Sequence, residues 1–75
     1  MDRQPITDDR SINGNIISMG YDEEKEILEI EYVQGFLYQY HKVPKEVYAK
    51  LLAERNKISF VQSRIAKVYR NQRIK

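Results

Sequence analysis

Residues 35–44, GFLYQYHKVP, decide how the rest of this chain is interpreted. Its three aromatic residues, Phe36, Tyr38 and Tyr40, lie at every second position and so share one face of an extended strand. Such a row is either an open platform on which nucleobases stack or the buried inner face of a sheet. The segments on either side of it favour the second interpretation.

Residues 27–33, ILEIEYV, alternate apolar and acidic side chains, as a half-buried strand does. A two-residue loop after them would put the glutamates on the same face as the tyrosines. A three-residue loop, 33–35, keeps the two sets apart and places Gly35 where a type I turn with a bulge needs a left-handed residue. Because a shift of one residue moves every side chain to the other face, we predict the three-residue loop. The predicted cross-strand pairs are Tyr32 with Phe36, Ile30 with Tyr38 and Leu28 with Tyr40.

Residues 16–22, IISMGYD, form the strand that precedes this hairpin. Ile17, Met19 and Tyr21 share one side of an extended segment. A four-residue loop at 22–25 would pair Tyr21 with Glu26, Met19 with Leu28 and Ile17 with Ile30. The sequence therefore predicts an antiparallel meander of three strands, at 16–22, 27–33 and 36–42, with one apolar face.

Two helices, at 44–55 and 59–70, are predicted to cover that face. Pro44 suits the first helical position, where its missing N–H costs nothing, and Asn56 is a plausible left-handed terminator. Ser59 and Gln62 have the spacing of a capping box for the second helix. The predicted buried stripes consist of Val47, Tyr48, Leu51 and Leu52 in the first helix, and of Val61, Ile65 and Val68, with Tyr69 at the margin, in the second. The fold class is α+β.

Both ends of the chain lack such a pattern. Residues 1–12 contain little apolar material and are predicted to be a flexible N-terminal tail. Residues 71–75, NQRIK, have no stripe to bury and are predicted to be a frayed basic C-terminus. Residues 13–70 then form a single domain.

The composition is that of a globular protein, with 41% hydrophobic and 32% charged residues. No apolar run approaches the roughly 20 residues of a membrane span, and the polar N-terminus is unlike a signal peptide. There is no cysteine, hence no disulfide and no thiolate metal site. A soluble cytoplasmic protein without a membrane partner is expected.

Several short motifs in this order resemble the KTSC domain, a small module named for the C-terminus of some lysyl-tRNA synthetases. Those at matching positions are Gly20-Tyr21-Asp22, Gly35, Tyr38 with Tyr40, and Val43-Pro44. The apolar positions of the second strand and of both helices also fit. The match is gapless over about residues 12–70. Asn13-Gly14, Asn56, Ile58 and Ala66 depart from the family's pattern.

The resemblance implies the β-β-β-α-α order and a stand-alone protein of bacterial or phage origin. It implies a structural role for the matching motif residues. The family's function is obscure, and RNA binding has been suggested for it. The arginine that the family carries after the isoleucine of the last helix is missing here, where the chain has Ala66, and Arg64 and Lys67 flank that position.

No motif for catalysis or for a cofactor is present. His41 is the sole histidine, and its outward position on the third strand is typical of a solvated side chain. Glu29 and Glu31 share the outer face of the second strand, where a carboxylate pair would lack the cleft that acid–base chemistry needs. The three glycines form no phosphate-binding loop. We therefore expect neither an enzyme nor a metal or cofactor site.

The charge distribution is the clearest functional signal. Residues 1–55 hold seven Lys or Arg against eleven Asp or Glu, a net charge of −4, whereas residues 56–75 hold six cations and no acid. These cations either complement a helix dipole and stay solvated or bind an acidic partner. The second interpretation predicts RNA or other single-stranded nucleic acid on the C-terminal helix. The candidate binding residues are Lys57, Arg64, Lys67, Tyr69, Arg70 and Arg73.

A protein partner is the alternative. The first strand of the meander is a candidate sheet edge that could pair with another chain, and the acidic body and basic end permit head-to-tail association. The protein would then be an adaptor, as a monomer or a weak homodimer. Tyr38 and Tyr40 are assigned to packing rather than to base stacking, since this register places them under the helices.

Overall fold

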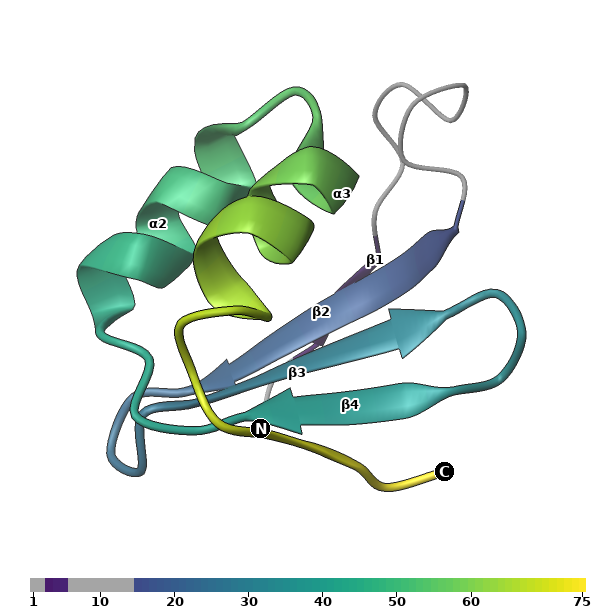
Figure 1. Cartoon of the computed structure of the whole chain (residues 1–75), viewed down its shortest axis with the longest axis horizontal. Coiled ribbons are helices and arrows are strands. Elements are labelled where there is room, and N and C mark those ends of the chain that lie inside the picture. The colour runs from purple at the N-terminus through teal and green to yellow at the C-terminus, as the bar shows by residue number, and fades with distance from the viewer. Residues whose placement is uncertain (1–2, 6–14) are drawn as a thin grey trace.

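The computed structural model describes residues 3–5 and 15–75 of the chain. It contains a five-stranded antiparallel sheet in the order β1-β2-β3-β4-β5, with the helices on one face of it (Figure 1). The predicted α+β class and the central meander are confirmed: β2 spans Ile16–Asp22, β3 spans Ile27–Tyr32 and β4 spans Leu37–Tyr40. Two additional short strands extend the meander, one on each side.

The hairpin of β3 and β4 has the predicted register. Leu28 lies opposite Tyr40 and Ile30 opposite Tyr38. The Tyr32 N–H donates to the Phe36 carbonyl over 2.8 Å, which closes the loop. Gly35 has a φ of +92°, the left-handed region that the turn requires and that glycine adopts without strain.

The register predicted for β2 against β3 is wrong by two residues. Met19 lies opposite Ile30 rather than Leu28, and Tyr21 lies opposite Leu28 rather than Glu26. The turn instead joins Asp22 to Ile27, with Glu26 in the left-handed region at φ 54°. A shift of two residues leaves each side chain on the same face of its strand, so this error does not change the prediction of one apolar face.

A bulge in β2 overturns the prediction for Ile17. The pairing is irregular between Ile16, opposite Tyr32, and Ser18, opposite Glu31. The extra residue reverses the alternation, so Ile16 is buried at 1% exposure and Ile17 is 39% exposed. The apolar face is therefore built from Ile16, not Ile17.

Residues in both supposedly irregular ends form strands. Arg3–Pro5 make β1, which pairs with β2, so β2 is not the sheet edge that the sequence suggested; the rest of the predicted tail lies outside the described residues. Asn71–Arg73 make β5, which pairs with β4 and corrects the prediction of a frayed end (Figure 1). Both edge strands have three residues, a length that limits pairing with other chains.

The first helix, α2, spans Lys45–Ala53, one residue later than predicted because Pro44 is its extended N-cap. The second begins earlier than predicted, as α3 at Lys57–Phe60, with Asn56 as its cap. The Asn56 side chain accepts from the Ser59 N–H over 3.0 Å. Asn56 thus starts this helix rather than ending the first, and Ser59 is not the cap.

The second helix continues as a wider π-helical segment, η1, at Val61–Ile65, and ends five residues before the predicted Arg70. The Ala66 N–H donates to the Val61 carbonyl over 2.7 Å, a bond across five residues. The wide turn and the early end rotate Val68 out to 65% exposure. Ala66 and Tyr69 pack against the core instead.

The core lies between the sheet and the helices. Its buried side chains come from β2, β3, β4, the segment after β4, α2 and η1, so each of these elements is needed to close it. They are Ile16, Met19, Leu28, Ile30, Tyr40, Val43, Leu51, Val61 and Ile65. Leu51, with Val47, Tyr48 and Leu52 packed around the core, confirms the predicted stripe of the first helix.

Candidate nucleic-acid interface

The six candidate binding residues do not lie on one helix face. Lys57 is buried at 3% exposure, and its ammonium Nζ donates to the Glu54 carbonyl over 2.7 Å. That bond satisfies a carbonyl at the end of α2 and ties the connection to the second helix. Lys57 is therefore a structural residue, and its assignment to a phosphate-binding surface is corrected.

Arg64 and Lys67 are exposed but line separate hollows. Arg64 lies beside the end of α2, in a hollow that also contains the acidic Glu54. Lys67 borders a different hollow with Gln62 and Ala66. The spacing of three residues between Arg64, Lys67 and Arg70 would place them on one face only if the helix continued to Arg70. Because the helix ends at Ile65, it does not place them there.

Tyr69 and Arg70 line a hollow of about 500 Å³ together with cations other than Arg64 and Lys67. We name this hollow the cationic pocket. It lies where the β2–β3 turn, the end of β4 and the segment after η1 come together. Within the part of the chain that the structure describes, no carboxylate lines it; the lining residues are Lys25, Ile27, His41, Lys42, Val68, Tyr69 and Arg70.

Three of these residues, Lys25, His41 and Lys42, were absent from the predicted site. They come close to Arg70 because β5 begins there: the His41 N–H donates to the Arg70 carbonyl over 2.8 Å. Lys42 has a φ of 59°, which turns the chain between β4 and α2. His41 is half-buried rather than fully solvated. The cations are visible in the sequence, but their proximity depends on the strand that the sequence did not reveal.

Arg73 lies at the other end of β5. Its guanidinium carbon is 4.7 Å from the centre of the Phe36 ring, a cation–π contact. Phe36 is 39% exposed, so it is only partly on the inner face to which the sequence assigned it. It borders a second hollow, of about 330 Å³, that we name the aromatic pocket. The aromatic pocket is lined by Asn15, Ile16, Tyr32, Gln34, Phe36, Tyr38, Ile58, Val61 and Gln62.

Tyrosines connect this pocket to the core. Tyr38 meets Tyr32 edge to face at 5.7 Å and stacks on Tyr40 at 6.4 Å. The hydroxyls of Tyr32 and Tyr40 lie 3.1 Å apart, and burial raises the pKa of both phenols. Tyr40 is a core residue, as predicted, whereas Tyr38 is half-buried and borders the aromatic pocket.

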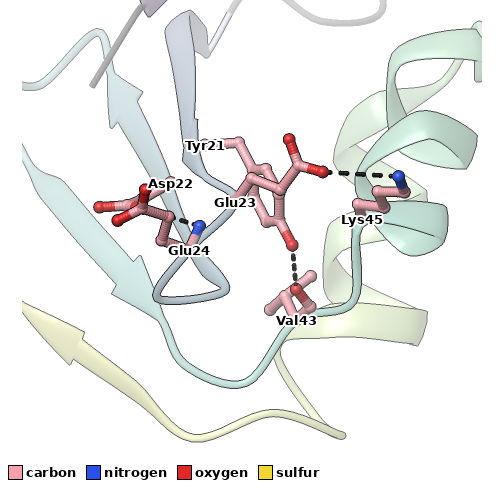
Figure 2. A network of polar contacts seen from close by, with 6 residues as sticks. All are labelled: Tyr21, Asp22, Glu23, Glu24, Val43 and Lys45. Carbon is pink, nitrogen blue, oxygen red and sulfur yellow. Dashed lines mark hydrogen bonds and ion pairs between the residues drawn. The ribbon is translucent and has the colours of Figure 1, made fainter.

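Three of the family motif residues, Tyr21, Asp22 and Val43, make hydrogen bonds at the other end of the sheet (Figure 2). The Tyr21 hydroxyl donates to the Val43 carbonyl over 2.5 Å, and the Tyr21 ring stacks on Tyr48 at 4.8 Å. The Asp22 carboxylate accepts from the N–H groups of Glu24 and Lys25, at 3.1 and 3.2 Å. These contacts fix the first turn and the start of α2.

The acidic residues of the outer sheet face are paired with neutral side chains. Glu29 accepts from Gln39 over 2.8 Å, and Glu31 accepts from Ser18 over 2.9 Å. Within residues 3–5 and 15–75, no three His, Cys, Asp or Glu side chains gather as a metal site would require. None of the helices described there has the length and apolar character to cross a membrane.

Comparison with known proteins places these features in a family. The sequence pattern of the KTSC domain matches residues 13–69. A protein of Stutzerimonas stutzeri (strain A1501), named only as uncharacterized, is 48% identical over 40 residues, which make up 53% of this chain and 56% of that protein. The match thus spans little more than half of that relative.

The fold has a close counterpart among solved structures. The crystal structure of a KTSC domain protein from Yersinia pestis superposes with a TM-score of 0.83 at 29% sequence identity, over 99% of this chain and 97% of that one. The family pattern covers well over half of the chain, and three of the motif residues that carried the resemblance, Tyr21, Asp22 and Val43, are among those drawn in Figure 2. This chain belongs to the KTSC domain family.

Proposed function

We propose that this KTSC domain binds single-stranded nucleic acid, RNA in particular, through the cationic pocket. The observation that supports this most is the convergence of Lys25, Lys42 and Arg70 around Tyr69 from three separate segments. Lys42 and Arg70 are exposed, so phosphates can reach them without displacing core residues. In this proposal the protein acts in the cytoplasm and has no catalytic step.

Cations in such a hollow bind a strand chiefly by releasing its counterions. Each phosphate that is neutralised on a single strand lowers the logarithm of the binding constant by about 0.7 per tenfold rise in salt. Three contacts, from Lys25, Lys42 and Arg70, correspond to a slope of about −2. Tyr69, half-buried against the core, supplies an aromatic ring on which a base can stack.

Acids beside the pocket limit the direction of the strand. Glu24 and Glu26 flank Lys25 in the turn, and Glu23 pairs with Lys45 at 3.4 Å (Figure 2). These carboxylates repel phosphates, whereas the chain after Arg70 contains no acid. We therefore expect the strand to leave the pocket along β5.

A pair of charge-reversal variants tests the proposal. Lys42→Glu/Arg70→Glu should weaken binding of a fluorescently labelled single-stranded RNA at least about tenfold at low salt, measured by anisotropy. The control, Arg64→Glu/Lys67→Glu, changes the net charge equally but lies outside the pocket, and should weaken binding far less. Equal losses in both variants would contradict a localised site, and no binding to the native protein would refute the function.

Self-association is the second candidate, and a group of apolar side chains favours it. Leu37 lies opposite Glu31 on the outer sheet face, and its carbonyl accepts from the Ile74 N–H over 2.7 Å. Val33, which follows β3, and Ile74 are 53% and 44% exposed. Sedimentation of the native protein at high concentration tests this: a monomer contradicts it, and a dimer that Val33→Lys dissociates supports it.

A further inference from the structure

The aromatic pocket lies at the opposite end of β4 from the cationic pocket. Tyr32, Phe36 and Tyr38 line it from the sheet, and Ile58 and Val61 line it from the second helix. Its volume of about 330 Å³ is at the lower end of the range for small-molecule sites. A ligand that fits it is small and largely apolar in surface.

The rings of this pocket are held in place by contacts with one another and with side chains outside it. Tyr38 is fixed by its edge-to-face contact with Tyr32 and by stacking on the buried Tyr40. Phe36 is held by the Arg73 guanidinium at 4.7 Å. Rings that are already ordered lose little conformational entropy when a flat ligand stacks on them.

Besides the hydroxyls of Tyr32 and Tyr38, the described polar side chains that line the pocket are three carboxamides, on Asn15, Gln34 and Gln62. Each carboxamide offers both a hydrogen-bond donor and an acceptor. The edges of nucleobases present the same mixture of donors and acceptors. Among the described residues, no ionisable side chain other than tyrosine lines the hollow, so these residues offer a charged group no counter-ion inside it.

Strand β5 joins the two pockets along the edge of the sheet. Arg70 lines the cationic pocket, and the next residues pair with β4 until Leu37, whose N–H donates to the Lys75 carbonyl over 3.3 Å. From His41 to Leu37 the sheet extends about 13 Å at the usual strand rise. Phosphates bound along Arg70, Arg73 and Lys75 would thus bring a base to the aromatic pocket.

We propose that the aromatic pocket receives one unpaired nucleobase of the bound strand. The base lies among Tyr32, Phe36 and Tyr38 with its edge toward the carboxamides, and its phosphate stays outside near Arg73. This inference rests on the proposed nucleic-acid function and adds to it a base-binding subsite. It assigns the selectivity of the domain for single strands to this subsite, since a paired base cannot enter.

The first experiment compares two strands with the same number of phosphates. One is a labelled single-stranded oligonucleotide of about eight nucleotides, within the roughly 4–16 that one small binding module covers. The other has the same backbone with abasic sites throughout. The native protein should bind the base-containing strand about five- to hundredfold more tightly, as stacking of one base implies.

Matched variants locate that preference. Phe36→Leu should lower it about fivefold or more, which is the share of the base in this pocket and not of a base on Tyr69, and leave the affinity for the abasic strand unchanged. The control, Phe60→Leu, makes the same substitution in the hollow beside Arg64 and should change neither affinity. Gln62→Leu, which keeps the side-chain size but loses the amide, should reduce the preference as well, and its fold is checked by circular dichroism.

The possible failures are distinguishable. Equal affinity of the native protein for both strands would overturn the base subsite and leave phosphate binding intact. A preference that is undiminished in both Phe36→Leu and Gln62→Leu would also overturn it. Binding of neither strand would refute the proposed function itself. Titration with an uncharged nucleoside, followed by NMR, should shift the amides of Gln34, Phe36 and Gln62, and no shift there would count against the subsite.

Discussion

Ile16 and Ile17 are identical neighbours with opposite environments. The alternation of β2 assigned Ile17 to the core, yet the bulge buries Ile16 and exposes Ile17. No residue in the sequence IISMGYD indicates a bulge, because a bulge depends on how the strand pairs with its partner. By contrast, the turn at Gly35 and the register of β3 against β4 could be predicted, since the position of the glycine and the regular alternation of side chains favoured one register.

Alanine substitutions test the bulge directly. Ile16→Ala removes a fully buried side chain and should lower the free energy of unfolding by about 2–5 kcal/mol. Ile17→Ala, the matched control, should lower it by less than about 1 kcal/mol, because its side chain is already partly solvated. Urea unfolding measures both changes. The reverse order of the two costs would mean that β2 has the regular alternation.

At the scale of elements, prediction succeeded where a pattern repeats and failed where an element is short. The long strands and the stripe of α2 follow from periodicity. Strand β5 has three exposed residues and no apolar alternation, so only its hydrogen bonds to β4 define it. Because β5 brings Arg70 to His41 and Arg73 to Phe36, missing it meant missing how both pockets are assembled.

A proline substitution tests the pairing of β5. Ile74→Pro removes the N–H that donates to the Leu37 carbonyl over 2.7 Å, whereas the control Ile74→Ala keeps it. In the proline variant the Leu37 amide should exchange with solvent about fivefold faster or more, as the loss of roughly 1 kcal/mol implies. The Ile30 amide, within the central strand, should be unaffected. Unchanged exchange at Leu37 would show that β5 does not pair there.

At the scale of the whole molecule, buried tyrosines couple the fold to alkaline pH. Burial is the largest cause that raises the pKa of Tyr21, Tyr32, Tyr40 and Tyr48 above the ordinary 10.0, and the hydrogen bond to Tyr32 raises that of Tyr40 further. A raised pKa in the folded state means that the folded protein holds the phenolic proton more tightly than the unfolded chain. Stability is therefore complete below pH 10.0 and falls as the pH rises above it.

Denaturant unfolding at a series of pH values checks this expectation. The free energy of unfolding should be level through neutral pH and decline above 10.0, with the near-ultraviolet signal of tyrosinate appearing as the protein unfolds. Tyr40→Phe removes one of the buried phenols, so its decline should be shallower than that of the native protein. A decline that is identical in the two proteins would show that Tyr40 does not contribute.

The separation of charge along the chain is also a property of the whole molecule. The sequence revealed that the cations gather after residue 55, and this suggested a nucleic-acid partner. It could not show that Lys57 is buried or that Lys42 joins Arg70, since both depend on tertiary packing. The nucleic-acid partner that the charge composition suggests stays a prediction, whereas the assignment of all the candidate cations to one helix face is wrong.

The salt dependence of RNA binding tests the central claim, a localised cationic site, most directly. In a plot of the logarithm of the binding constant against that of the salt concentration, the three cations of the cationic pocket should contribute about −2 to the slope of the native protein. Lys42→Glu/Arg70→Glu removes two of these contacts, so its slope should be shallower than the native slope by about 1.4, whereas Arg64→Glu/Lys67→Glu should keep the native slope. Equal slopes for all three proteins would contradict the claim.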